Sequence, residues 1–257
     1  MKTHWRVQVL FISIVFCFAA CTSTSLEVRK KQAEAGRNLG EAYLSQGNYT
    51  LALREFLKAK ELYGNNKFLH DDLGLTYMAK DRLDLAIKHF KKALAIDPGY
   101  APAKNNLGTA YMEKKDWDTA IKLFKEVAGD LLYATPQFPL SNLGWAYYNQ
   151  GEYELALKYY HEALEINSQF LNALRGLGLT YIAMGKGPEA VAILEVSVKH
   201  YPQPQYAQLH FDLGEAYTLS RNYEKAFNAF QKVLKLVPNT PLARKAKIES
   251  QKIKNFK

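Results

Sequence analysis

Leu143-Gly144-Trp145-Ala146-Tyr147 decides the fold, because the pattern Leu-Gly-x-x-Tyr occurs six times along the 257-residue chain. The glycines of the six copies are spaced by 34, 34, 36, 34 and 36 residues, and they are Gly40, Gly74, Gly108, Gly144, Gly178 and Gly214. Nine residues after each tyrosine stands an alanine, and four residues further on stands phenylalanine, tyrosine or leucine. A near-constant period of this length predicts a stack of similar units, each of which contacts only its neighbours.

Each unit has the pattern of two helices. Leucine, glycine and tyrosine of the motif lie on one face of a first helix, and the alanine and the large apolar residue share one face of a second. Glycine is less favourable than alanine in a helix by about 1 kcal/mol, so its recurrence predicts a close helix crossing there. Turn residues such as Gln46-Gly47-Asn48 fall between the two helices. We therefore expect helix-turn-helix pairs over residues 33–238.

The pattern resembles the tetratricopeptide repeat over residues 33 to about 238. The resemblance implies an all-α fold, a right-handed superhelical solenoid of six tetratricopeptide repeats with a C-terminal capping helix. Residues 239–257 contain good helix formers after Pro241 and carry six cationic residues against one acid, Glu249. This segment is predicted to be the capping helix with a hydrated outer face, and the alternative is a basic patch for lipid or an acidic partner.

The first twenty residues have the pattern of an export signal. Lys2 and Arg6 form a basic start, and residues 7–20 are an uncharged run of fourteen. That run is too short for a comfortable transmembrane helix, but it suits the core of a signal peptide. We therefore expect residues 1–20 to be removed from the mature protein.

Phe18-Ala19-Ala20-Cys21 resembles the lipobox of bacterial lipoproteins, in which the cysteine is acylated. The resemblance implies that Cys21 carries lipid, palmitate included, and that residues 21–32 form the lipidated cysteine and a polar tether. One acyl chain binds membranes with a constant on the order of 10⁴ M⁻¹, so several chains give lasting attachment. Thr22, in place of an inner-membrane retention aspartate, implies the periplasmic face of the outer membrane. The alternative is a free N-terminal cysteine, which suits an oxidising compartment poorly.

The distribution of charge disfavours a nucleic-acid partner, and the motifs disfavour catalysis. The formal charge of +9 could indicate nucleic acid or anionic lipid, but the cations are spread along the chain, which favours a solvated helical surface and no nucleic-acid partner. The sequence has no phosphate loop, no Gly-x-Ser-x-Gly and no cluster of histidine and cysteine at metal-ligand spacing. We expect no catalytic residue, metal ion, cofactor or small-molecule substrate, and hence a binding protein rather than an enzyme.

The tetratricopeptide resemblance also implies a binding groove, because the first helices of successive repeats line the concave surface in that family. The residues predicted to line this groove are apolar or aromatic, and they are Phe68, Leu75, Met78, Trp145, Tyr148, Leu179, Ile182 and Phe211. Such a groove favours an amphipathic helix or an extended apolar segment of a protein partner. Leu75, Leu179 and Ile182 could instead belong to the core, whereas large rings such as Trp145 and Tyr148 are typical anchors.

A lipobox, six repeats and a terminal cap together resemble the type IV pilus biogenesis/stability lipoproteins, the pilotins of the pilus secretin. Asp130-Leu131-Leu132-Tyr133 is similar to a stretch of that family at the same lengthened junction, after the third repeat. The resemblance implies an outer-membrane lipoprotein that helps the secretin to reach the membrane and assemble. The alternative is an adaptor for periplasmic peptidoglycan hydrolases or for another envelope complex.

Overall fold

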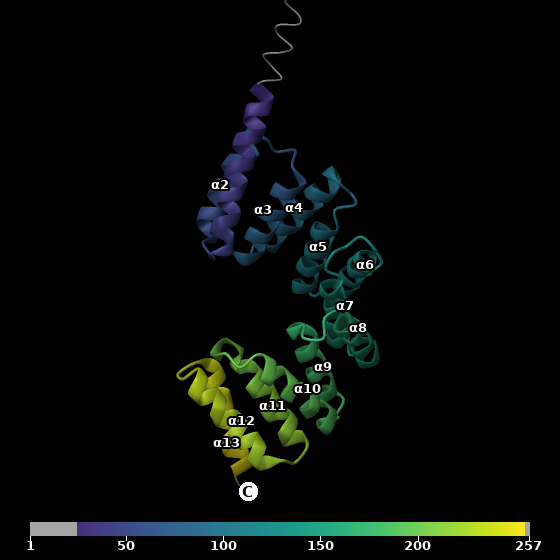
Figure 1. Cartoon of the computed structure of the whole chain (residues 1–257), viewed down its shortest axis with the longest axis vertical. Helices are drawn as coiled ribbons and strands as arrows, with labels where there is room; N and C mark the ends of the chain where they lie inside the picture. The colour runs from purple at the N-terminus through teal and green to yellow at the C-terminus, as the bar shows by residue number, and fades with distance from the viewer. Residues whose placement is uncertain (1–24, 255–257) are drawn as a thin grey trace, which may run out of the picture. The chain divides into compact units, whose positions relative to one another are not determined.

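The computed structural model describes residues 25–254, and every regular element among them is helical (Figure 1). The first helix covers residues 25–45. It is followed by α2 (Tyr49–Leu62), α3 (Lys67–Ala79), α4 (Leu83–Ile96), α5 (Ala101–Glu113), α6 (Trp117–Ala128), α7 (Gln137–Gln150), α8 (Tyr153–Ile166), α9 (Leu171–Ala183), α10 (Gly187–His200), the 3₁₀ turn η1 (Pro204–Tyr206), α11 (Ala207–Leu219), α12 (Tyr223–Leu236) and α13 (Pro241–Lys254). Within residues 25–254, none of the helices combines the length and apolar character needed to cross a membrane.

The predicted helices are confirmed, and within each compact unit they pack as pairs. Each Leu-Gly-x-x-Tyr motif lies in the first helix of a pair, and the following alanine and large apolar residue lie in the second. The predicted capping helix is α13, which packs against α12 and α11 through Ala243, Ala246 and Ile253.

The chain divides into two compact units, Met1–Lys114 and Lys115–Lys257. The boundary falls between α5 and α6, which are the two helices of the third predicted repeat. The predicted repeat block of residues 33–238 is therefore divided, and each unit has its own apolar core. Phe56 and Leu73 are central in the first core, and Phe230 and Ala216 are central in the second.

The repeat glycines are explained by large apolar side chains that lie on them. A Cβ atom added to Gly74 would lie 2.3 Å from Cε1 of Phe90, and one added to Gly144 would lie 2.7 Å from Cδ1 of Tyr160. The same relation joins Gly40 to Phe56, Gly178 to Leu194, and Gly214 to Phe230. Real Cβ atoms do not approach other atoms so closely, so the expected close crossing of paired helices is confirmed.

The turn between the paired helices contains a left-handed residue in every repeat. Three of these residues are glycines, Gly47, Gly151 and Gly185, with φ of 74°, 82° and 74°. The equivalent residues in the other repeats are Asp81, Lys115 and Arg221, with φ of 55°, 62° and 57°. A Cβ atom makes this region less favourable than it is for glycine, and the penalty is smallest at Asp81, whose short polar side chain tolerates it.

The N-terminal predictions lie partly outside the described residues. Residues 1–20 of the predicted signal peptide and the predicted lipidation site Cys21 are among the residues not described. Residues 25–32 differ from the expected tether, because they are helical and continue into the first repeat helix. The stretch is rich in good helix formers, and the ammonium group of Lys30 lies 5.3 Å from the ring centroid of Tyr63, the residue directly after α2.

Candidate functional site

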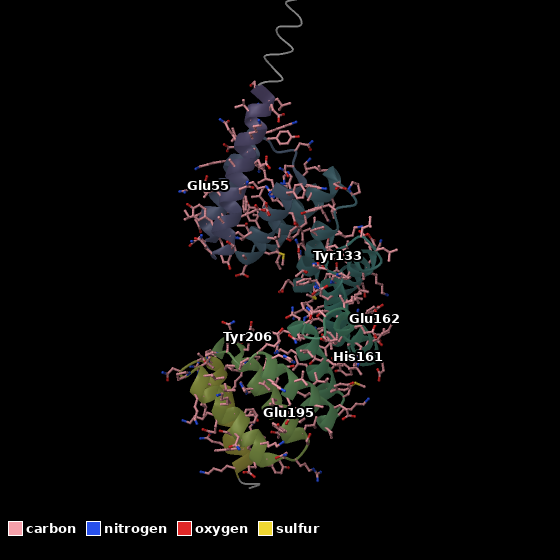
Figure 2. The ribbon with its side chains drawn as sticks, in the orientation of Figure 1. Glu55, Tyr133, His161, Glu162, Glu195 and Tyr206 are labelled. Atoms are coloured by element: carbon pink, nitrogen blue, oxygen red, sulfur yellow. The ribbon has the colours of Figure 1, made fainter. Side chains whose placement is uncertain are left out.

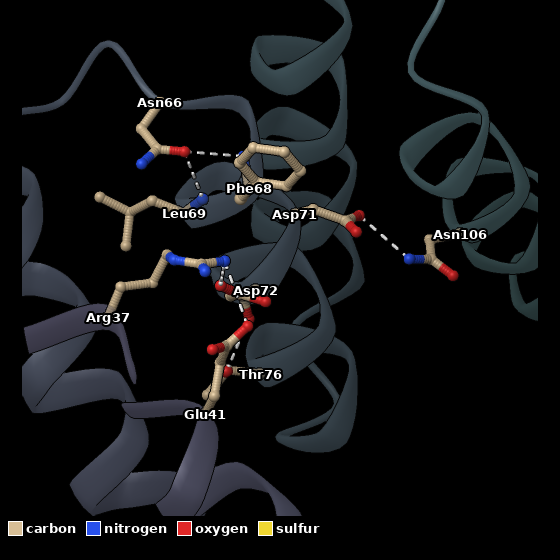
Figure 3. Close-up of polar contacts among 9 residues, drawn as sticks. All are labelled: Arg37, Glu41, Asn66, Phe68, Leu69, Asp71, Asp72, Thr76 and Asn106. Carbon is tan, nitrogen blue, oxygen red and sulfur yellow. Dashed lines mark hydrogen bonds and ion pairs between the residues drawn. The ribbon is translucent and has the colours of Figure 1, made fainter. Parts of the chain in front are cut away.

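In the first unit, successive first helices are joined by polar contacts at two fixed repeat positions. The side chain three residues before one repeat glycine meets the side chain two residues before the next. Arg37 Nη1 lies 3.3 Å from Asp72 Oδ2, and Asn106 Nδ2 donates to Asp71 Oδ1 at 3.0 Å (Figure 3). Arg37 also pairs with Glu41 at 3.1 Å. We call the contacts that join neighbouring repeats, here Arg37 with Asp72 and Asp71 with Asn106, the polar ladder.

The second unit contains the same contact at the same positions. Arg175 Nε donates to Asp212 Oδ2 at 2.6 Å, and Gln208 Nε2 donates to the other carboxylate oxygen at 2.8 Å. The side chain of Asp212 is only 2% exposed. The ladder residues are thus engaged in holding neighbouring repeats together, and they are not free to bind a partner.

The ladder is interrupted between α7 and α9. The two ladder positions there are Ser141 and Gly176, so the second has no side chain. The ring of Tyr160 fills this space, since a Cβ atom on Gly176 would lie 2.2 Å from Tyr160 Cζ. The Tyr160 hydroxyl is buried without a hydrogen-bond partner in the described chain, and burial raises its pKa. An aromatic ring therefore replaces the polar contact at this one interface.

Trp145 and Tyr148 lie on α7 beside this interruption, and the structure brings their rings together. Their rings are stacked, with centroids 5.2 Å apart and an interplanar angle of 16°. Tyr153 lies against Tyr148 at a centroid distance of 5.9 Å. Both stacked rings are only half-buried, and partial burial raises the pKa of the Tyr148 hydroxyl.

The stacked rings belong to a larger surface, which we call the unit 2 face. On each of α7, α9 and α11 it contains two residues, which stand one and four positions after the repeat glycine. These residues are Trp145, Tyr148, Leu179, Ile182, Glu215 and Thr218. Because α9 packs against both α7 and α11, the equivalent positions adjoin one another. All six are half-buried, so they are accessible in the second unit taken by itself.

The predicted groove residues of the first unit are also accessible. Phe68 is 45% exposed and packs edge-to-face on Tyr100 at 5.3 Å, with the ammonium group of Lys67 over both rings. Leu75 and Met78 are half-buried. This ring pair has a counterpart in the second unit, where Phe138 meets Phe170 at 5.0 Å.

The prediction that Phe211 lines the groove is wrong. Phe211 is 8% exposed and its ring packs against that of Phe230 at a centroid distance of 5.4 Å. It occupies a ladder position of α11, but its side chain is an apolar ring, which packs into the core of the second unit.

A pocket of about 280 Å³ lies at one end of the unit 2 face. Its lining residues come from α9, α11, α12 and α13, and they are Ile182, Glu215, Thr218, Leu219, Phe230 and Glu249. Burial, and then the neighbouring Asp212 and Glu249 carboxylates, raise the pKa of Glu215 to about 6. Sequence reasoning missed the contribution of Glu249, since the rotation of the capping helix depends on how it packs.

The junction between α6 and α7, where Tyr133 lies, is an ordered turn (Figure 2). Asp130 Oδ1 accepts from the Leu132 amide at 3.0 Å, and the Asp130 carbonyl accepts from the Tyr133 amide at 3.1 Å. These bonds hold Leu131 and Leu132 outward, and they are 99% and 94% exposed in the second unit. Both leucines are therefore accessible in the second unit.

The first unit also contains a buried histidine pair. The Nδ1 atoms of His70 and His89 are 2.9 Å apart, and His70 Nε2 lies 3.0 Å from the Gly64 carbonyl oxygen. A carbonyl only accepts, so His70 Nε2 donates, and neutral His70 accepts at Nδ1 from His89. Burial lowers the pKa of both rings, that of His89 to about 4. Among residues 25–254 no three His, Cys, Asp or Glu side chains are grouped to hold a metal ion.

We expect acid to destabilise the first unit through this pair. The unfolded chain binds protons near the ordinary histidine pKa of 6.5, whereas folded His89 does so only near about 4 and the pKa of folded His70 is also lowered. Stability from the pair is therefore complete above about pH 6.5 and is lost as the pH falls. Burial raises the pKa of Asp71 to about 6 and of Asp72 to about 7, which acts in the opposite direction.

The variant His89→Asn separates the effect of the histidine pair from that of Asp71 and Asp72. The asparagine amide can still donate a hydrogen bond, but it does not titrate. The midpoint of urea unfolding should fall less between neutral pH and about pH 4.5 in this variant than in the wild type. Asp71 and Asp72 are present in both proteins, so their contribution cancels. Equal pH dependence of the two midpoints would show that the histidine pair does not titrate with folding.

Comparisons with known proteins agree with this architecture. Five models described as "Tetratricopeptide repeat" match residues 23–67, 77–130, 139–170, 172–204 and 207–240. The structure of PilF from Pseudomonas aeruginosa superposes with a TM-score of 0.73 and 21% identity, covering 89% of this chain and 99% of that one. PilW, described as a widely conserved type IV pilus biogenesis factor, gives a TM-score of 0.76 and 20% identity, over 83% and 97% of the chains.

One curated relative matches only a part of this chain. Protein O-mannosyl-transferase TMTC1 of Homo sapiens is 31% identical over 102 residues, which are 40% of this chain. The match spans only 11% of that protein. The likeness therefore concerns a short segment of TMTC1 rather than the whole protein.

Proposed function

The chain belongs to the tetratricopeptide-repeat family of protein-binding scaffolds, and from this premise we propose that it assists assembly of the type IV pilus secretin at the outer membrane. The observation that carries the proposal is the unit 2 face, where two stacked rings stand accessible beside the interruption of the polar ladder. Large rings bury much area at little entropic cost, and they are the usual anchors of protein interfaces.

Likeness to two pilus-related structures supports the choice of partner. PilF and PilW both match over nearly their whole lengths, and PilW is by description a type IV pilus biogenesis factor. The exposed turn at Asp130–Tyr133 lies at the junction that the pilotin resemblance singles out. An apolar or amphipathic segment of the secretin subunit would bind across the unit 2 face.

The proposed mechanism is an increase in local concentration. Acyl chains on Cys21 hold the scaffold on the periplasmic face of the outer membrane. The helical units then shield an apolar segment of the secretin and gather subunits at the membrane where the ring forms. Tethering of this kind raises the effective concentration of a bound partner without any new contact.

The variant Cys21→Ser tests the anchor. We expect the variant to keep the helical circular-dichroism spectrum of the wild type, since the described helices begin after Cys21. It should nevertheless move from the outer-membrane fraction to the soluble periplasmic fraction, because its acylation site is gone. Blots of fractionated cells provide the measurement, and a variant that still sediments with outer membranes would exclude lipidation at Cys21.

A further inference from the structure

The pocket at the end of the unit 2 face combines apolar walls with two carboxylates. Ile182, Leu219 and Phe230 provide the apolar surface, while Glu215 projects from α11 and Glu249 from α13. Pockets for neutral apolar groups rarely include carboxylates, because an ionised group beside apolar surface is costly unless it is paired. The composition of this pocket therefore indicates a ligand that is apolar along its length and cationic at its end.

The carboxylate of Glu215 is poorly compensated within the protein. It forms no hydrogen bond or ion pair in the described part of the chain, and it is half-buried. Asp212 on its own helix and Glu249 on α13 are unfavourable to its charge, while Lys245 on α13 and Arg175 on α9 favour it at longer range.

Two cationic side chains near the pocket are paired with acids other than Glu215. Arg175 is paired with Asp212 at 2.6 Å, and Lys252 is paired with Glu249 at 2.8 Å. The side chain of Glu249 remains 34% exposed. A cation that reached both glutamates would relieve their mutual repulsion and pair a carboxylate that is otherwise alone.

We propose that this pocket receives the side chain of a lysine or arginine from a protein partner. The methylene groups of that side chain lie against Ile182, Leu219 and Phe230, and its charged end reaches Glu215 and Glu249. Long cationic side chains are suited to such a site, because their stems bury on apolar surface while their ends stay charged. The inference rests on the protein-binding function proposed above and adds the chemistry of one contact.

The proposal also orients the partner. The unit 2 face is aromatic on α7, aliphatic on α9 and acidic on α11, and the pocket at its end adds Glu249 from α13. A bound segment therefore places its apolar residues over Trp145 and Tyr148 and its basic residue toward the capping helix.

The test uses two small probes of nearly equal shape, n-pentylammonium chloride and 1-pentanol. Each is titrated into the isotope-labelled Cys21→Ser protein, and methyl resonances of Ile182, Thr218 and Leu219 are followed by NMR. We expect the ammonium probe to bind roughly tenfold more tightly than the alcohol, the ratio typical of one charge-assisted hydrogen bond. Its affinity should rise between about pH 5 and about pH 7 as Glu215 ionises, while that of the alcohol should not change.

Variants of the two glutamates complete the test. In Glu215→Gln with Glu249→Gln the preference for the ammonium probe should disappear, while the alcohol binds as before. The single change Glu249→Gln is at a partly exposed residue and should reduce the preference without affecting the fold. The matched control Glu224→Gln removes an exposed acid from α12, outside the pocket, and should leave the preference intact.

Equal affinities of the two probes for the wild type would overturn the proposal, as would a preference that persists in the double variant. The titration needs no secretin, so its outcome is independent of the function proposed above. A wild-type protein that captures secretin but shows no preference for the ammonium probe would reject the pocket proposal alone.

Discussion

Replacing Arg175 with alanine is expected to lower the free energy of unfolding by about 3 kcal/mol, the cost of leaving a buried charge without its partner. Its guanidinium lies 2.6 Å from Asp212, whose side chain is 2% exposed. Gln208 still donates to Asp212 in the variant, but an amide does not neutralise the carboxylate. Urea unfolding followed by circular dichroism measures the loss.

The equivalent change in the first unit, Arg37→Ala, is a matched control and should cost less. Arg37 lies 3.3 Å from Asp72, whose side chain is 12% exposed. Burial, together with the nearby Glu41 charge, raises the pKa of Asp72 to about 7, so this carboxylate can take up a proton when its partner is lost.

A second change should rescue the Arg175 variant. Adding Asp212→Asn to Arg175→Ala removes the unpaired charge, so the double variant should be more stable than Arg175→Ala alone. An Arg175→Ala protein as stable as the wild type would show that the polar ladder does not hold the repeats together.

The helix pairs were predictable because they depend on local periodicity. Leucine, glycine and tyrosine of each motif share a helical face whatever the neighbouring repeats do, and the glycine indicates the ring that lies on it. The stacked pair Trp145 and Tyr148 was predictable for the same reason, since residues one turn apart on a helix meet.

Contacts between repeats were not predictable in this way. The pairing of Arg175 with Asp212 depends on the angle at which α9 and α11 pack, which no single repeat encodes. Phe211 occupies a repeat position expected to face a groove, but its ring packs against Phe230 of α12 in the core. Glu249 joins the pocket through the packing of α13, and the left-handed turns at Asp81 and Arg221 lack the glycine that would have indicated them.

The double variant Trp145→Ala, Tyr148→Ala is expected to weaken partner binding by at least about 30-fold, because truncating one anchor ring commonly costs about 2 kcal/mol or more. Both rings are half-buried, so their removal takes little from the core of the second unit. We therefore expect the variant to keep its helical spectrum and its location in the cell, but to leave few heat-stable secretin multimers.

A second aromatic pair of the same unit provides the control. Tyr201 and Tyr206 are also half-buried and in contact, with centroids 5.1 Å apart, but they lie outside the unit 2 face. The variant Tyr201→Ala, Tyr206→Ala should leave the multimers at wild-type level. Normal multimers in cells with the Trp145 and Tyr148 variant would exclude those rings as the anchor.

Crosslinking in intact outer membranes, followed by purification of this protein and identification of what it carries, tests the proposed role most directly. We expect the wild type to recover the type IV pilus secretin, and we expect the Trp145→Ala, Tyr148→Ala variant to recover little of it. A wild-type protein that never recovers secretin, and carries peptidoglycan hydrolases or another envelope complex in its place, would contradict the proposed function.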